Sequence, residues 1–297
     1  MSRIIAANLR LAGIKHRTTF QAYMKEQSRS TDVRPPAFMY NKFEIHYRTF
    51  RGRKVWTLRA KGASCRQHIF YLHGGAYVVN FTLPHWRYMG TLAERLHATV
   101  IAPDYPLAPE HHAEEVFDMN VPLYREVLND AGNSALALMG DSAGGGLALA
   151  LAQVLKKRKI PQPARIVLLS PWLDISMSNP QIAQVDKEDP ILNVEGLIAS
   201  GKQYAGGLDP RDHRVSPIYG PMEGLAPITV FIGTHDVLLP DCRRLKLRAE
   251  SAGTPVSVHE YKGMLHDGML YPIPEARDIR DRIVEILRCR ETGTQRS

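Results

Sequence analysis

The sequence has few cysteines, no long apolar run and no recognisable leader, and each shortage excludes a class of protein. Its three cysteines, Cys65, Cys242 and Cys289, lie far apart and form no CxxC pair, which argues against a disulfide framework and against a zinc site. No apolar run approaches the ~18 residues that a membrane-spanning helix requires. Residues 1–17 mix basic residues with short apolar pieces and lack the continuous apolar core of a secretion signal. We therefore expect a cytoplasmic protein without an integral membrane segment, a metal or a cofactor.

The net charge of +8 comes entirely from the first part of the chain. Residues 1–66 contain 15 Lys and Arg against 3 Asp and Glu, a net charge of +12, and the remainder contains 23 against 27, a net charge of −4. Such a segment could contact nucleic acid or anionic lipid. Because no aromatic-interleaved motif accompanies the charges, we interpret the segment as a solvated basic face and expect no nucleic-acid partner.

Short apolar runs recur between helix-length segments from residue 68 onward. The runs are IFYL (69–72), TVIA (99–102), LALM (136–139), RIVLL (165–169) and ITVFI (228–232), with a last strand expected at 256–261. The helices expected between and after them are 83–96, 110–129, 143–159, 239–252 and 275–290. Short, near-continuous apolar runs are typical of strands buried on both faces. The alternation predicts an α/β fold with a mostly parallel central sheet and helices on both faces.

Two stretches depart from this alternation. Residues 3–28 have apolar residues at helical spacing and predict one or two N-terminal helices, followed by a strand pair at 43–47 and 55–58. Residues 174–220 are too long for one simple crossover and contain a helix-like piece at 194–204. We expect this insertion to lie over the carboxyl ends of the strands, where open α/β sheets bind ligands.

One serine lies between two glycines where a strand is expected to become a helix. Gly140-x-Ser142-x-Gly144 has the strand–turn–helix setting of a nucleophile elbow, which exposes the serine hydroxyl at the top of the sheet. Two other interpretations are a glycine-rich turn in which Ser142 caps the helix and a phosphate loop. The phosphate loop is disfavoured because no Gly-Lys-Ser/Thr ends the run. A serine nucleophile also requires a base, an acid and donors for an oxyanion.

The chain supplies candidate oxyanion donors after the expected strand at 69–72. The sequence there is HGGAY (73–77), in which two glycines allow the backbone to approach a substrate closely. Gly74 and Gly75 would donate their N–H groups, and the N–H of Ala143 would be a third donor. The alternative is a simple Gly-Gly turn beside a structural histidine.

The candidate acid is Asp236, which follows the strand at 228–232 and so fits the order Ser…Asp…His. Asp174 also follows a strand and is its main rival. Asp241 and Asp267 are interpreted as a helix-start residue and a loop residue.

The candidate base is one of 12 histidines and is selected by its position in the chain. His266 lies in the loop after the final strand, where the base of such a site is expected. His259 falls inside the strand pattern, and His235 neighbours the candidate acid.

Seven motifs carry a resemblance to a known family: HGGAY (73–77), DYPLAPE (104–110), GDSAGGGLAL (140–149), SPWLD (170–174), DPIL (189–192), GTHDVLLPD (233–241) and GMLH (263–266). The chain resembles the α/β-hydrolases of the hormone-sensitive-lipase-like group, which are bacterial carboxylesterases. The resemblance implies the α/β-hydrolase fold, the triad Ser142, Asp236 and His266, and the three oxyanion donors named above. It also implies a helical cap. The expected division is an N-terminal cap segment at 1–40, the core at 41–173 and 221–297, and a cap insertion at 174–220.

The sequence departs from the family pattern at three places. Pro106 stands where the family usually has arginine, and residues 111–114 read HHAE where a Phe-Pro stretch is usual. After the histidine the family often has Gly-Phe, whereas this chain has Asp267 and Gly268. These departures leave the triad intact and concern the acyl pocket, for which the candidate lining residues are Tyr77, Leu83, Trp86, Tyr204 and Leu238. Core packing is the alternative role of each of them.

We therefore predict a serine carboxylesterase that hydrolyses small to medium acyl esters through an acyl-enzyme, with a small-molecule ester as its partner. An amidase or formamidase using the same site is the alternative. A hormone-receptor-like binding module is disfavoured because such modules lose a triad residue, and a nucleic-acid or membrane-surface role would rest on the basic segment alone. The family also leads us to expect a homodimer formed through the last strand and helix.

Overall fold

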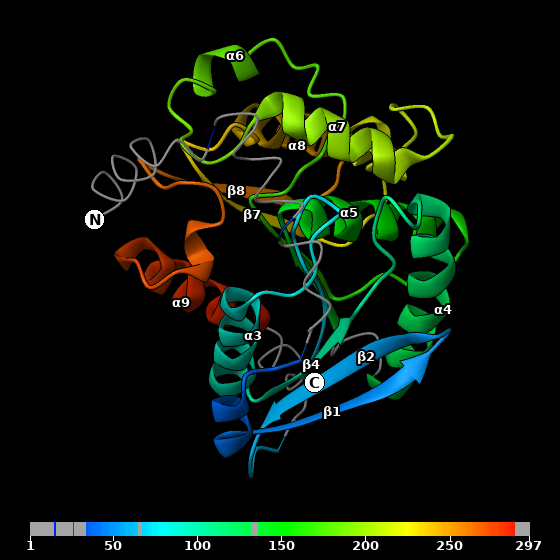
Figure 1. The fold of residues 1–297 in the computed structure, drawn as a ribbon, viewed down its shortest axis with the longest axis vertical. Coiled ribbons are helices and arrows are strands. Elements are labelled where there is room, and N and C mark those ends of the chain that lie inside the picture. Colours follow the sequence, from blue (N-terminus) through cyan, green and yellow to red (C-terminus); the bar gives the residue numbers. More distant parts are fainter. Residues whose placement is uncertain (1–14, 16–25, 27–33, 65–66, 132–135, 289–297) are drawn as a thin grey trace, which may run out of the picture.

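The computed structural model describes residues 15, 26, 34–64, 67–131 and 136–288 of the chain (Figure 1). The helices expected within residues 3–28 therefore lie outside the described residues, apart from Lys15 and Glu26. Cys65 and Cys289 also lie outside them, whereas Cys242 is a buried free thiol.

The centre of the molecule is an eight-stranded sheet with the order β1-β2-β4-β3-β5-β6-β7-β8. Its strands are β1 (Phe43–Phe50), β2 (Arg53–Ala60), β3 (Gln67–Leu72), β4 (Ala98–Pro103), β5 (Leu136–Asp141), β6 (Arg165–Leu169), β7 (Ile228–Gly233) and β8 (Val256–Tyr261). β2 is antiparallel to both β1 and β4, and the other neighbours are parallel. The predicted mostly parallel sheet is confirmed, and so is the strand pair at its amino-terminal edge.

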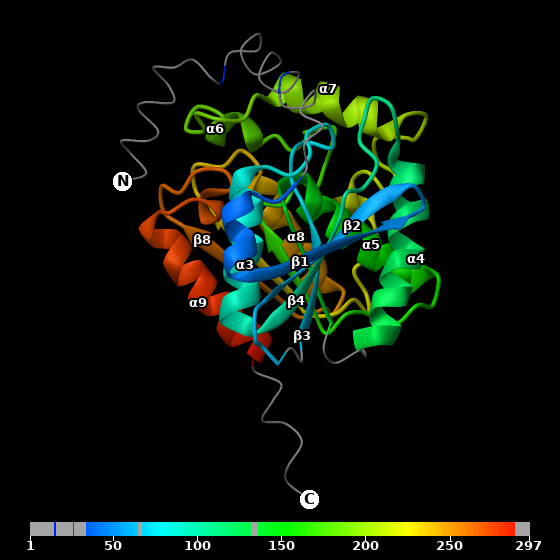
Figure 2. The same cartoon turned by 60° about the horizontal axis from the view of Figure 1, so that its bottom comes forward.

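Helices cover both faces of the sheet (Figure 2). The long ones are α3 (Leu83–Leu96), α4 (Ala113–Ala131), α5 (Ser142–Lys157), α7 (Val194–Ala205), α8 (Leu239–Ser251) and α9 (Pro274–Arg288). α3 and α9 pack on one face, and α4, α5 and α8 pack on the other. Short elements are η1 (Ala37–Asn41), α6 (Ile182–Val185), η3 (Pro217–Tyr219) and η4 (Gly268–Leu270).

The strands divide their side chains between two hydrophobic cores. In β3, Phe70 and Leu72 belong to the core under α4 and α5, whereas Ile69 and Tyr71 belong to the core under α3 and α9. Successive side chains of a strand point to opposite faces, so a strand that is covered on both sides must be apolar along its whole length. This is the physical reason for the near-continuous apolar runs in the sequence.

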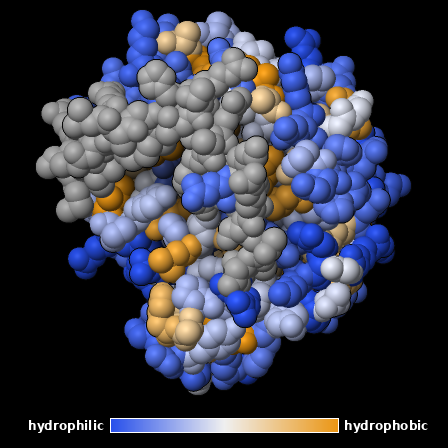
Figure 3. Space-filling model, viewed as in Figure 1, coloured by the Kyte–Doolittle hydropathy of each residue, from blue (hydrophilic) through white to orange (hydrophobic). Residues whose placement is uncertain are grey.

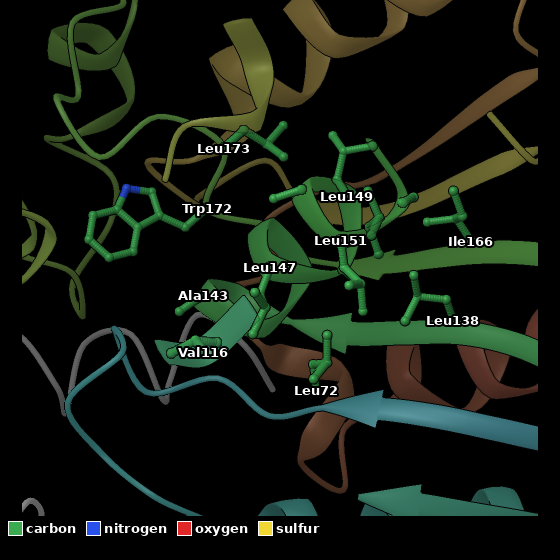
Figure 4. Packing of buried hydrophobic residues seen from close by; sticks show 14 of the residues in the cluster. Leu72, Val116, Leu138, Ala143, Leu147, Leu149, Leu151, Ile166, Trp172 and Leu173 are labelled. Atoms are coloured by element: carbon green, nitrogen blue, oxygen red, sulfur yellow. The ribbon is translucent and has the colours of Figure 1, made fainter. Parts of the chain in front are cut away.

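α5 is buried along almost its whole length. Every residue from 142 to 155 is buried, as expected of a helix that is hydrophobic on all sides. Figure 4 shows Leu72, Leu138 and Ile166 of the neighbouring strands on the sheet side of Leu147 and Leu151 of this helix. Because the residues of its first turns are buried as well, the amino-terminal end of α5 is fixed by packing.

Residues 174–220 leave the sheet after β6 and contain α6 and α7, which lie at the top of Figure 1. Lys15 reaches this segment, with its Nζ 2.9 Å from a carboxylate oxygen of Asp186 and 2.8 Å from the carbonyl oxygen of Asp189. Two segments far apart in the sequence therefore meet on this side of the molecule.

The face seen in Figure 3 is mostly hydrophilic, and apolar residues form small separate patches on it. Among the described residues, no helix has both the length and the apolar character needed to cross a membrane.

Candidate active site

Ser142 lies at a sharp turn between β5 and α5. Its φ angle of 50° is in the left-handed region, which is costly for a residue other than glycine and is common at functional sites. A Cβ atom at Gly140 would lie 2.3 Å from the carbonyl oxygen of Gly144, and one at Gly144 would lie 2.1 Å from that of Leu72. Only glycine fits at either position, so the two glycines permit the turn that holds the serine.

Three side chains that are far apart in the sequence form a connected chain of hydrogen bonds. His266 Nε2 lies 3.0 Å from Ser142 Oγ, and its Nδ1 lies 2.9 Å from Asp236 Oδ2. All three side chains are buried. With its proton on Nδ1, the imidazole donates to the carboxylate and accepts from the serine hydroxyl. The other oxygen of Asp236 accepts the N–H of Leu238 at 3.0 Å, which holds the carboxylate in place.

Asp174, the rival candidate for the acid, has other partners. Its carboxylate accepts hydrogen bonds from the hydroxyl groups of Ser176, Ser178 and Tyr219 at 2.5 to 2.9 Å. Burial by itself would raise the pKa of Asp174, and these hydrogen bonds lower it overall. In the described part of the chain, it is Asp236 and not Asp174 that hydrogen-bonds to Nδ1 of His266.

The loop after β3 brings backbone N–H groups to the serine. The N–H of Gly74 donates to Asp141 Oδ2 at 2.9 Å, so this group has a partner other than an oxyanion. Among the described residues, the N–H groups of Gly75, Ala76 and Ala143 donate no hydrogen bond to another protein atom. Gly75 and Ala76 have φ angles of 115° and 52°, which turn this backbone sharply.

Asp141 joins this loop to the nucleophile turn, a role that was not expected from the sequence. Its carboxylate accepts from Tyr71 Oη at 2.6 Å, from the Gly74 N–H, and from His85 Nε2 at 3.1 Å. Burial by itself would lower the pKa of His85, but the charge of Asp141 raises it overall, and His85 in turn holds the pKa of Asp141 low. The neighbouring His73 is neutral because burial lowers its pKa to about 3. The only sequence signal was an acidic residue inside the GxSxG motif.

Asp267 is a second carboxylate at the imidazole. Its Oδ2 lies 3.2 Å from His266 Nε2, the same nitrogen that faces the serine. Burial raises the pKa of Asp267 to about 6, His266 opposes this shift, and Asp141 and Asp236 add to it. From the sequence alone, Asp267 was expected to be a loop residue.

The candidate pocket residues fall into two groups. Tyr77 and Tyr204 stack with ring centroids 3.6 Å apart, and the Trp172 ring lies 5.6 Å from Tyr77. Leu238 belongs to the same core and directly follows the loop of Asp236. These residues connect α7 to the loop after β3, on the side of the sheet that carries α5.

The other two candidate pocket residues, Trp86 and Leu83, belong to α3. The Trp86 ring packs edge-on against Trp56 at 5.4 Å and lies tilted against Phe81 at 5.2 Å, in the core under α3 and α9. Leu83 begins α3 and is 41% exposed. The structure therefore places Trp86 in a different core from Tyr77 and Tyr204.

The arrangement has the components of nucleophilic acyl transfer: a hydroxyl, a base oriented by a carboxylate, and N–H groups of the loop after β3 and of the start of α5 that have no protein partner in the described part of the chain. Among the described residues, no group of three His, Cys, Asp or Glu side chains is placed to hold a metal ion.

Comparison with known proteins adds an independent line of information. A family model described as the alpha/beta hydrolase fold matches residues 69–270. An esterase of Acinetobacter venetianus is 35% identical over 227 residues, which cover 75% of this chain and 75% of that protein. An acetyl-hydrolase of Streptomyces hygroscopicus is 33% identical over 212 residues, which cover 70% of this chain and 71% of that protein.

Solved structures extend the similarity to nearly the whole chain. An esterase of the bacterial hormone-sensitive lipase family has a TM-score of 0.84 and 28% identity, and the match covers 97% of both chains. A hormone-sensitive lipase from a metagenome library has a TM-score of 0.85 and 27% identity, and the match covers 98% of this chain and 99% of that one.

Proposed function

The chain belongs to the family of the α/β-hydrolase fold, and within it we propose a serine esterase whose nucleophile is Ser142, whose base is His266 and whose acid is Asp236. It is a carboxylic ester hydrolase. The single observation that carries the residue assignment is the buried hydrogen-bond chain from Ser142 Oγ through both ring nitrogens of His266 to Asp236.

The mechanism follows from these contacts. His266 Nε2 takes the proton of Ser142 Oγ as the oxygen attacks the ester carbonyl, and Asp236 stabilises the imidazolium that forms. The tetrahedral intermediate collapses as Nε2 gives the proton to the leaving alcohol. Water then attacks the acyl-enzyme in the same way, which releases the acid and restores the serine.

The oxyanion donors we propose are the N–H groups of Gly75 and Ala143, with Ala76 next to them. These groups have no protein partner among the described residues, and Ala143 also lies in the first turn of α5, where the helix dipole favours negative charge. One such donor contributes roughly a hundredfold to a thousandfold to turnover. Gly74, which was expected to donate directly, would act instead by tying the loop to Asp141.

The substrates we propose are esters with small to medium acyl groups. Two relatives carry the names esterase and acetyl-hydrolase. The stacked pair Tyr77 and Tyr204 is buried, and the Tyr77 hydroxyl lies close to Gly146 in the first turns of α5. Residues 174–220, which carry Tyr204, would form a cap over the site. Three cysteines, of which Cys242 is buried and unpaired, fit a cytoplasmic enzyme.

The test is labelling and turnover with one variant. A fluorophosphonate should label the wild-type chain at Ser142, and Ser142→Ala should lose both the label and the hydrolysis of p-nitrophenyl acetate while keeping the wild-type circular dichroism spectrum. Retained turnover in Ser142→Ala would refute the assignment. Faster turnover of an aryl formamide than of p-nitrophenyl acetate would favour the amidase alternative.

A further inference from the structure

Two oxygens compete for one nitrogen in this site. His266 Nε2 lies 3.0 Å from Ser142 Oγ and 3.2 Å from Asp267 Oδ2, while Asp236 occupies the opposite nitrogen. A serine, a histidine and one carboxylate suffice for the mechanism. The second carboxylate therefore needs its own explanation.

The charge of Asp267 decides which protonation state of His266 is favoured. If Nε2 carries a lone pair, an ionised carboxylate 3.2 Å away faces that lone pair and is repelled. If Nε2 carries a proton, the same carboxylate accepts a charge-assisted hydrogen bond. Ionised Asp267 thus favours the imidazolium, and the pKa of His266 agrees: burial lowers it, but Asp267 first and Asp236 second raise it well above its ordinary value.

The backbone fixes the carboxylate where it is. Asp267 has a φ of 50°, and its N–H donates to Ser170 Oγ at 3.2 Å. Its Oδ1 is buried and has no hydrogen-bond partner among the described residues. Among the described residues, His266 is therefore the charged partner of the Asp267 carboxylate.

Other charged and titratable groups surround the pair. Asp141 and Asp236 act on Asp267, and both oppose its ionisation. Asp189 is in electrostatic contact with His266, and His85, Tyr71 and Tyr88 are in electrostatic contact with Asp267. His73 and Tyr105 are in electrostatic contact with Asp141. His85 is paired with Asp141, and Arg280 acts on Tyr88. The imidazole of His266 is the cation partner closest to Asp267.

We propose that Asp267 is a positioning residue that acts through His266. Its charge makes the imidazole a stronger base and stabilises the imidazolium. For the same reason, the imidazolium of the free enzyme loses its Nε2 proton only at a higher pH. This inference rests on the proposed triad. In the attack step the Ser142 Oγ–H proton moves to Nε2 and later to the leaving alcohol, and Asp267 itself neither gains nor loses a proton.

The proposal predicts opposite effects at low and high pH. An opposite charge within about 4–6 Å shifts a pKa by roughly one to three units, so removal of the Asp267 charge should move the acid limb of kcat/KM down by about one pH unit or more. On the high-pH plateau the variant has the weaker base, and turnover should fall by about threefold to tenfold because proton-transfer rates follow basicity only in part.

The variants are Asp267→Asn and Asp267→Gly. Both replacements adopt the left-handed backbone of this position readily, so the loop is retained. The matched control is Asp241→Asn, which removes another buried carboxylate, one that accepts from Asn179 at 2.9 Å and does not touch His266. The substrate is p-nitrophenyl acetate, whose phenolate leaves without protonation, so the acid limb reports His266 as a base.

A second measurement does not depend on turnover. The ring carbon of His266 is followed by nuclear magnetic resonance as pH is varied, in Ser142→Ala with and without Asp267→Asn. The expected result is a lower titration midpoint without the aspartate and an unchanged midpoint in the Asp241→Asn control. The inference is overturned if the acid limb of kcat/KM and the titration midpoint of His266 stay in place or move to higher pH. It is also overturned if turnover on the high-pH plateau rises in both Asp267 variants. Failure of the triad itself would appear separately, as turnover that survives Ser142→Ala.

Discussion

Asp141→Asn tests how the loop after β3 is held against the nucleophile turn. The carboxylate accepts three hydrogen bonds, from Tyr71, the Gly74 N–H and His85. An asparagine side chain has the same shape, but only one of its two terminal groups accepts. If the amide nitrogen takes the place of Oδ2, the Gly74 N–H and His85 Nε2 both face a donor; if it takes the place of Oδ1, the Tyr71 hydroxyl must turn to accept. In either orientation His85 loses its counter-charge.

The magnitude follows from burial. Asp141 is fully buried and His85 is 6% exposed, and removal of one partner of a buried ion pair costs on the order of 3 kcal/mol. Gly74 precedes the proposed donor Gly75, and a misplacement of about 1 Å in such a group costs roughly a hundredfold in rate. We expect kcat to fall about a hundredfold with KM nearly unchanged, because the donor acts mainly in the transition state.

The assay combines steady-state hydrolysis of p-nitrophenyl acetate with unfolding in urea. Tyr71→Phe is the matched control, since it removes one hydrogen bond from Oδ1 and leaves both bonds to Oδ2. It should lower kcat by less than about tenfold, a small fraction of the effect of a lost donor. A folded Asp141→Asn variant with wild-type kcat would refute the idea that this carboxylate positions the loop.

The stability difference should also depend on pH. The pKa of His85 is raised above 6.5, so its share of the stabilisation is fully present below pH 6.5 and is lost as pH rises through the raised value. The pKa of Asp141 is lowered below 3.8, so its share is present above that pH and is lost as pH falls. The difference in unfolding free energy between wild type and Asp141→Asn should therefore be largest between these limits.

Three other predictions concern the acid, the pocket and a buried carboxyl. Asp236→Asn should lower kcat by up to about 10⁴-fold, far more than Asp174→Asn, and the reverse ranking in p-nitrophenyl acetate assays would exchange their roles. Tyr204→Ala should remove the ring stacked on Tyr77 and shift the preferred p-nitrophenyl ester to longer acyl chains; an unchanged acyl-length profile would count against a pocket role. Burial raises the pKa of Asp241 to about 6, so wild type should lose stability as pH rises from 4 to 6. In urea unfolding, the free energy of unfolding of Asp241→Asn should fall less than that of wild type over this pH range. An equal fall in both proteins would contradict the raised pKa of Asp241.

The fold was predictable because its central strands, from β4 to β7 in the sheet, are buried on both faces. Such strands are uniformly apolar, and the helix-length segments between them could be located by elimination. The resemblance to hormone-sensitive-lipase-like esterases is confirmed by the family match and the structural neighbours. The chain order of Ser142, Asp236 and His266 was also readable, because each follows a strand and carboxyl ends of parallel strands meet at one edge.

The finer features of the site depend on where individual groups point, and residue types alone do not reveal this. The backbone of Asp267 adopts the left-handed region, which turns its carboxylate toward His266, and a loop sequence does not reveal that turn. The Gly74 N–H points to Asp141 because the loop and the elbow meet in space. Trp86 was expected near the site, but its position on α3 directs it to the core on the other face.

The burial of α5 has a consequence for how the enzyme loses activity. A helix enclosed by the sheet and by α4 cannot separate locally, because its detachment would expose most of one core. The turn that holds Ser142 should therefore keep its structure until the molecule unfolds as a whole. Reversible inactivation below the melting temperature would then originate in the loop after β8, which carries His266, or in residues 174–220, which contain α7. Hydrogen exchange should be slowest along 144–155 and should approach there the rate set by global unfolding.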